Sequence, residues 1–183
     1  MKYTSEVFQR LSRGQFISSN SVDAETRAIY NDIEENQKEY EDYFAQIDFI
    51  LCSGNGYYYF ARKEQRIITE NKLAALMVWI DYVDFFTSYD PTFDAGTQFT
   101  TAQIEVRVKS DVELRNKLDN IIPDKVSLQD KVGDLVKKLT DTGFAELINE
   151  VEGMYQVTTA FRYITNIIEC LNIDEEVKDE IPE

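Results

Sequence analysis

The chain has 183 residues and carries 34 acidic side chains against 19 basic ones, which gives a formal net charge of −15. It contains no histidine, so every mechanism that needs an imidazole base or a histidine metal ligand is excluded. Hydrophobic residues make up 43% of the chain, enough for a folded core, and the net charge disfavours tight binding to a phosphate backbone.

The chain begins with the pattern of a short helix followed by an extended segment. Val7, Phe8 and Leu11 share one helix face, and Arg13-Gly14 provides a stop signal. Residues 15–17 then read as extended. We therefore expect a helix and a short strand before residue 20.

Two further helices and a β-hairpin are predicted next. Asp23 and Asn36 are the residue types that cap helix N-termini, so each is expected to begin a helix. The run FILCS-GNG-YYYFA places Asn55-Gly56 between two strand-prone segments. This pair favours a tight hairpin because both residues tolerate positive φ. Helix, strand, two helices and a hairpin is the order of a winged-helix domain.

A longer helix is predicted from Thr69 to a point before Pro91. Its apolar residues recur at helical spacing and predict one buried stripe. The members of this stripe are Leu73, Leu76, Met77, Ile80 and Val83.

The winged-helix order is then predicted a second time. An extended piece at residues 97–99 precedes three helices, each with a capping residue at its start. The caps are Thr100 or Thr101, then Asp111, then Ser127 with Asp130 three residues on. A hairpin, GFAELIN-EVEG-MYQVT, and a closing helix with Ile164, Ile167, Ile168 and Leu171 complete the pattern.

The two halves resemble each other, which favours a divergent duplication. We align Gln15-Phe16 with Gln98-Phe99, and the glycine of the first hairpin with Gly153 of the second. The predicted fold is a mainly helical α+β protein of tandem winged-helix domains with β-hairpin wings. The domains are predicted at 1–68 and 69–171, packed together through the Thr69 helix, with an acidic tail at 172–183.

Catalytic signatures are absent from the sequence. It has no G-x-S-x-G nucleophile motif and no glycine-rich phosphate loop, and Cys52 has no histidine to activate it. Asp81 and Asp84 share a helix face beside Trp79 and Tyr82, so a carboxylate enzyme is a third, weaker hypothesis. We expect no enzyme, no cofactor and no metal site.

Aromatic side chains are the candidates for a partner interface. In the wing Tyr57–Phe60, alternate rings face opposite sides of a strand, so two should join the core and two should face outward. Outward rings could contact a partner, or the whole hairpin could simply be well packed. The candidate interface residues are Tyr57, Tyr59, Trp79 and Tyr82.

Basic side chains cluster at the positions where winged helices meet DNA phosphates. The second wing carries three acidic residues, which disfavours a sequence-specific DNA-binding protein. They are Glu146, Glu150 and Glu152. Weak, non-sequence-specific DNA contact within an assembly is the alternative that stays open. The candidate DNA contacts are Arg62, Lys63, Arg66, Lys137 and Lys138.

A cytoplasmic location is expected from what the sequence lacks. The longest nearly apolar stretch, Leu73 to Ile80, is far shorter than the roughly 20 residues that cross a bilayer. No signal peptide is predicted, and two cysteines are too few for a disulfide framework.

Several of these segments resemble one known family. The stretch LSRGQFISSNS…AIYNDIEENQKEYEDYFAQIDFIL…GYYYFAR is similar to the amino-terminal winged helix of MukE and MksE proteins, the accessory subunits of bacterial MukBEF/MksBEF-type SMC (condensin-like) complexes. The second half agrees in its order of elements, ending in Gly143-Phe144…Tyr155…Phe161. The resemblance covers most of the chain.

This resemblance implies a non-catalytic KITE-type subunit that forms a homodimer. It would bind a kleisin (MukF/MksF-like) subunit and, through it, an SMC ATPase associated with the nucleoid. The role would be chromosome organisation, condensation and segregation, or plasmid defence. The alternative function is a stand-alone winged-helix DNA-binding regulator.

Overall fold

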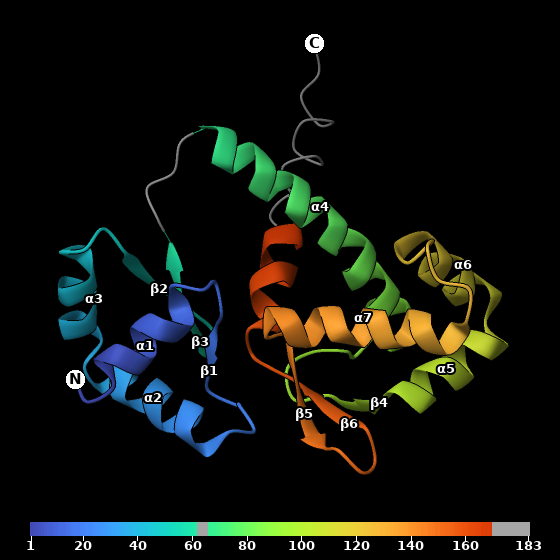
Figure 1. Cartoon of the computed structure of the whole chain (residues 1–183), viewed down its shortest axis with the longest axis horizontal. Coiled ribbons are helices and arrows are strands. Elements are labelled where there is room, and N and C mark those ends of the chain that lie inside the picture. The colour runs from blue at the N-terminus through green and yellow to red at the C-terminus, as the bar shows by residue number, and fades with distance from the viewer. Residues whose placement is uncertain (62–65, 170–183) are drawn as a thin grey trace, which may run out of the picture.

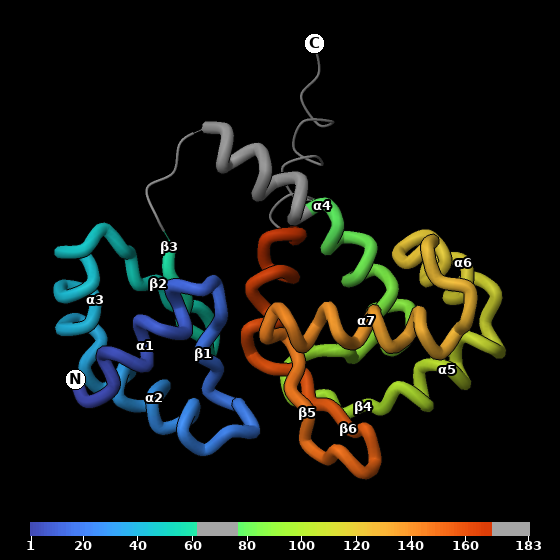
Figure 2. Tube along the Cα trace, viewed as in Figure 1, coloured from blue at the N-terminus to red at the C-terminus, as the bar shows by residue number. Residues whose placement is uncertain are grey.

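The computed structural model describes residues 1–61 and 66–169, with the side chains of the long helix α4 from residue 77 onward. The first sheet lies with α1–α3 at the left of the molecule, and the second sheet lies near the lower centre with α5 and α6 to its right (Figure 1). The long helix α4 runs diagonally from the top of the picture down toward α6. Figure 2 follows the same path along the Cα trace. The predicted class, a mainly helical α+β fold, is confirmed.

The first half has the predicted order of elements. Its three strands form an antiparallel sheet in the order β1-β3-β2, so β3 is central. The elements are α1 (Thr4–Leu11), β1 (Ile17–Ser18), α2 (Ala24–Glu35), α3 (Gln37–Ala45), β2 (Ile50–Gly54) and β3 (Tyr57–Ala61).

The second half repeats this order with two additional helices, one between β4 and β5 and one after β6. Its sheet has the order β4-β6-β5 and is also antiparallel. The elements are α4 (Arg66–Tyr89), β4 (Gln98–Thr100), α5 (Thr101–Ser110), α6 (Val112–Ile121), α7 (Leu128–Thr142), β5 (Ala145–Asn149) and β6 (Met154–Val157), followed by a closing helix over residues 161–169.

Helix caps account for most of the boundaries. The Asp23 carboxylate accepts hydrogen bonds from the N–H groups of Glu25 and Thr26. Three more caps are confirmed: Thr100 forms a capping box with Gln103, Asp111 accepts from Leu114 N–H, and Ser127 accepts from Asp130 N–H. Because each cap satisfies an otherwise unpaired N–H group, each fixes where its helix begins.

One local prediction is wrong, and another is confirmed with a difference in detail. Asn36 does not cap α3, because it is the single residue between two helices and its amide donates instead to the Asp32 carbonyl oxygen at 2.9 Å. The predicted hairpin at Asn55-Gly56 is confirmed, since Gly54 pairs with Tyr57 across it, but of its two turn residues Gly56 has a positive φ, at 88°, and Asn55 does not. The turn therefore depends on the glycine alone.

The predicted stripe of α4 is wrong in part: Val83 is half-buried and packs against the second core, but Met77 and Ile80 do not. The side chains of Leu73 and Leu76 lie outside the described residues. Met77 and Ile80 are 62% and 39% exposed, whereas Trp79, Tyr82 and Phe86 are buried. Both sets repeat at helical spacing, so periodicity could not separate them. The aromatic set is buried because larger rings remove more apolar area from water.

The strand register corrects the alignment of the two halves by one residue. Ile17 pairs with Tyr58 in the first sheet, and Phe99 pairs with Tyr155 in the second. Since the hairpins themselves correspond, Phe99 is equivalent to Ile17 rather than to Phe16. Both equivalent side chains are buried, whereas Phe16 is only half-buried.

The helix before each hairpin ends in the same motif. Asp48 has a φ of 63° after α3, and Gly143 has a φ of 83° after α7. In each case the next residue returns its N–H to a carbonyl oxygen five residues back: Phe49 to Phe44, and Phe144 to Leu139. A left-handed residue followed by this bond is the Schellman motif, in which glycine is the usual residue.

Candidate functional site

Strand β3 separates two hydrophobic cores. Tyr58 and Phe60 pack into the core of the first half, whereas Tyr57 and Tyr59 pack against the core of the second half. Successive side chains of a strand point to opposite faces, and both faces of this sheet are covered. The predicted alternation is therefore confirmed, and the outward pair contacts the same chain.

An aromatic cluster joins the two halves at this face of β3. The Phe16 ring lies 5.5 Å from Phe144 and 5.2 Å from Tyr163, measured between ring centroids. Tyr59 lies 5.0 Å from Tyr163, and Trp79 of α4 lies 4.9 Å from Phe144. The tilted and edge-on angles are those that aromatic pairs prefer.

A cavity of about 280 Å³ lies within this cluster. Exposed Gly14 and Gln15 are at its rim, and its walls are apolar and aromatic. We call it the interdomain cavity. It is lined by Gly14, Gln15, Phe16, Tyr59, Phe60, Trp79, Thr142, Phe144, Tyr163 and Ile164.

The phenols at this site are held in the neutral form. Burial, followed by the proximity of Cys52, raises the pKa of Tyr59 to about 12, and burial likewise raises the pKa of Tyr57. A neutral phenol can donate a hydrogen bond while its ring contacts apolar groups. The cavity is thus suited to an apolar or aromatic side chain from a partner, and it offers no charge to a phosphate.

A set of hydrogen bonds also joins the two halves. The Asn20 side chain donates to the Val157 carbonyl oxygen at 3.0 Å and accepts from Thr159 N–H at 2.8 Å. The Asn20 carbonyl oxygen accepts from Gln156 at 3.0 Å. We call this set, with the bonds to Glu146 described next, the polar clasp.

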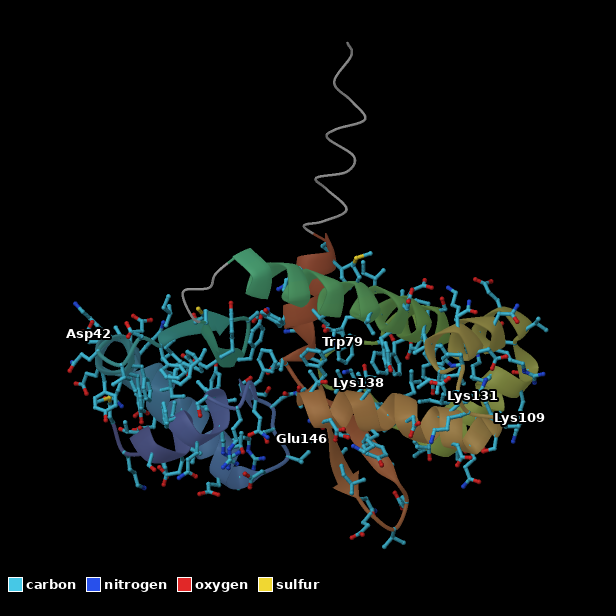
Figure 3. All side chains as sticks on the ribbon, turned by 45° about the horizontal axis from the view of Figure 1, so that its top comes forward. Asp42, Trp79, Lys109, Lys131, Lys138 and Glu146 are labelled. Atoms are coloured by element: carbon cyan, nitrogen blue, oxygen red, sulfur yellow. The ribbon has the colours of Figure 1, made fainter. Side chains whose placement is uncertain are left out.

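Glu146 is part of this clasp. Its carboxylate accepts from the Ser21 hydroxyl at 2.9 Å and from Val22 N–H at 2.6 Å. Figure 3 shows Glu146 where the second hairpin meets the first half. Its position on the wing had suggested a free surface charge that argues against DNA binding. In the structure that argument applies only to Glu150 and Glu152, which are exposed.

The four predicted interface aromatics have different environments. Tyr59 and Trp79 line the interdomain cavity, whereas Tyr57 and Tyr82 are buried at 4% and 6% exposure. Tyr82 packs on Trp79 at 5.0 Å, and burial raises its pKa. Contact of these residues with a partner protein stays a prediction, for which Tyr59 and Trp79 are the better placed.

The predicted DNA contacts are not brought together in the described residues. Arg62 and Lys63, and the side chain of Arg66, lie outside the described part of the chain. Lys137 is paired with Asp141 on α7. The Lys138 ammonium lies 5.7 Å from the centroid of the Trp79 ring, and Figure 3 shows these two side chains at the centre of the molecule.

The acidic pair on α4 is not arranged as a catalytic dyad. Asp84 binds the Lys117 ammonium at 2.8 Å, whereas Asp81 is exposed. Among residues 1–61 and 66–169, no group of three or more Cys, Asp or Glu side chains could hold a metal ion. The carboxylate-enzyme hypothesis therefore gains no geometric support.

Several residues of the site were missed from the sequence. Phe16, Phe144 and Tyr163 were not singled out as interface residues, although the wing aromatics were. Asn20 could not be identified from the sequence, because a loop amide that hydrogen-bonds to backbone groups far along the chain is not marked by any sequence motif. The burial of Thr158 and Thr159, directly after β6, could not be predicted from the sequence either.

Comparison with protein families identifies a match over most of the chain. The family model described as "Condensin complex protein MksE" matches residues 2–168. No curated protein matches the chain. Over the described stretches of the chain, no helix combines the length and apolar character of a membrane span.

Proposed function

This chain belongs to the MksE family of condensin complex proteins, and on that premise we propose that it binds the kleisin subunit of an SMC complex without catalysing a reaction itself. Membership of the family identifies it as a condensin-associated accessory subunit. The partner would be a MukF/MksF-like kleisin and, through it, an SMC ATPase.

The observation that supports kleisin binding is the interdomain cavity. Tyr59, Trp79 and Phe144 form apolar walls around a space of about 280 Å³ that is open at Gly14 and Gln15. Aromatic pockets with neutral polar tips are typical anchor sites for protein partners. We infer that an apolar side chain of the kleisin enters this cavity.

Co-purification tests the proposal. The full chain would be expressed with the kleisin and SMC subunits of its own genome, and we expect all three to be recovered together. Phe16→Ala and Tyr59→Ala should weaken recovery of the kleisin, whereas Tyr89→Ala, which changes a half-buried tyrosine at the other end of α4, should not. Recovery of the wild-type chain without kleisin would contradict the proposal.

We also propose that the chain forms a homodimer through the outward side of α4. Met77, Val78 and Ile80 are 62%, 50% and 39% exposed and follow one another along the helix. Contiguous exposed apolar residues of this kind mark interfaces. Sedimentation of Met77→Glu/Ile80→Glu should then give half the mass of the wild-type protein, and equal masses would exclude this interface.

Direct DNA contact is a narrower proposal within the assembled complex, where the protein would be cytoplasmic and associated with the nucleoid. Lys138 is exposed and has no carboxylate partner among the described residues, which is the one observation that favours it. Lys138→Gln should lower the DNA affinity of the complex and its salt dependence slightly. A mobility shift of the isolated chain on duplex DNA would instead favour a stand-alone regulator.

The biological role is proposed to be chromosome organisation, condensation and segregation, or plasmid defence. Deletion of the gene distinguishes them. Anucleate cells with normal plasmid uptake would indicate chromosome work, and increased plasmid maintenance with normal segregation would indicate defence.

A further inference from the structure

Helix α3 presents a mixed acidic and apolar face to solvent. It buries Tyr40 and Phe44 against the first core, so the opposite side of the helix points away from the protein. Figure 3 shows Asp42 at the outer edge of the molecule. In a winged helix the helix before the hairpin is the one that enters the DNA major groove. The chemistry of α3 is therefore informative.

The charge on this face is negative and largely uncompensated. Among the described residues, the one cation that pairs with these carboxylates is the N-terminal amine, 3.8 Å from Glu39. Lys38 is exposed and in no ion pair with them. Such a face repels phosphates. The exposed acids are Glu34, Glu35, Glu39, Asp42 and Asp48.

Large apolar side chains are exposed beside these acids. Tyr43, Ile47 and Ile50 are 46%, 47% and 46% exposed. They follow one another from the second half of α3 into the start of β2, which is an edge strand of its sheet. Apolar surface surrounded by charge of one sign is the composition of a protein-binding surface.

The equivalent helix of the second half is different. On α7 acids and bases are equal in number, and most of them are paired with each other or with neighbouring segments. Lys137 pairs with Asp141, and Asp134 lies 3.4 Å from Lys125. The excess of acids over bases is thus a feature of α3 and not of the fold position.

We propose that the α3 face, formed by Glu39, Asp42, Tyr43 and Ile47 with Glu35 at the end of α2 and Ile50 at the start of β2, binds a basic amphipathic segment of a partner protein. Lysine or arginine side chains of the segment pair with the carboxylates, and its apolar side chains cover Tyr43 and Ile47. This surface is separate from the interdomain cavity, so the proposal goes beyond kleisin binding at that cavity and does not depend on it.

Fluorescence anisotropy with a labelled synthetic helix of leucine and lysine tests the proposal. The full chain should bind this probe at moderate salt. Glu39→Gln/Asp42→Asn should weaken binding about tenfold, and Tyr43→Ala/Ile47→Ala should weaken it similarly without changing the charge. The matched control is Glu150→Gln/Val151→Ala/Glu152→Gln, which removes two exposed acids and an exposed valine from the second hairpin and should bind as the wild type does.

A charge-reversal variant controls for misfolding, because a variant that fails to fold would not gain a new binding partner. Glu39→Lys/Asp42→Lys should lose the lysine probe and bind a leucine–glutamate helix instead. Three results would overturn the proposal: equal weakening in the α3 and hairpin variants, displacement of the probe by duplex DNA, and conversion of a dimer to a monomer by Tyr43→Ala/Ile47→Ala.

Discussion

The carboxylate of Glu146 accepts a 2.6 Å hydrogen bond from the backbone N–H of Val22, a contact between residues 124 positions apart. The Ser21 hydroxyl, which is almost fully buried, donates to the same carboxylate. The orientation of the two halves is therefore set by side-chain chemistry as well as by apolar contact.

Glu146→Ala should lower the free energy of unfolding by about 1–3 kcal/mol, because it leaves the Ser21 and Val22 donors without their acceptor. Urea unfolding followed by circular dichroism measures this. Glu150→Ala on the same hairpin is the control and should change the stability little. Equal effects of the two substitutions would mean that the clasp contributes nothing measurable.

Asp48→Gly should raise the free energy of unfolding by up to about 1 kcal/mol. Asp48 is the one non-glycine residue with a positive φ in the described part of the chain, and an L-residue in the left-handed region costs roughly 1–2 kcal/mol. The greater freedom of glycine in the unfolded chain offsets part of this gain.

Gly143→Ala is the reciprocal experiment at the equivalent position. It should be destabilising by about 1 kcal/mol, since a Cβ there would find space but not a favourable φ. Thermal unfolding of both variants compares them directly. Stabilisation by Gly143→Ala would show that the left-handed conformation is not required.

The starts of the helices illustrate what could be predicted from the sequence. Caps such as Thr100, Asp111 and Ser127 act within one turn, so residue type and spacing were sufficient to place them. The buried side of α4 was not predictable, because Met77 and Trp79 belong to two stripes of equal period. The clasp and the cavity join residues far apart in the chain, and no local pattern encodes such contacts.

Stability should fall as the pH rises through 10 to 12. Burial raises the pKa of Tyr58 from 10.0 to about 12, and the pKa values of Tyr40 and Tyr59 are raised to about 12 as well. A raised tyrosine pKa means that the stabilisation is complete below pH 10 and is lost as the pH approaches the folded-state value.

Tyr58→Phe should lessen this loss, by at most about 1.4 kcal/mol at about pH 11, because a phenylalanine has no proton to release. The measurement is the free energy of urea unfolding at about pH 8 and about pH 11 in the wild type and the variant. The same alkaline loss in both proteins would show that Tyr58 ionises normally in the folded state.

Kleisin binding should change the emission of Trp79, the single tryptophan of the chain, which lines the interdomain cavity. Titration of the purified chain with the kleisin should shift the emission maximum and reduce quenching by acrylamide. The Tyr89→Ala variant should respond in the same way. A complex that forms without any change at Trp79 would place the kleisin elsewhere on the protein.

The bonds of Asn20 have a consequence for how the cavity selects its occupant. The two ends of one amide engage the backbone on either side of Thr158, so the two halves, which both contribute residues to the cavity, are held together before anything enters. Because the cavity is already ordered, most of the conformational entropy lost on binding is that of the incoming segment. Affinity should therefore rise when that segment is made stiffer, and gain little from further rigidity in this chain.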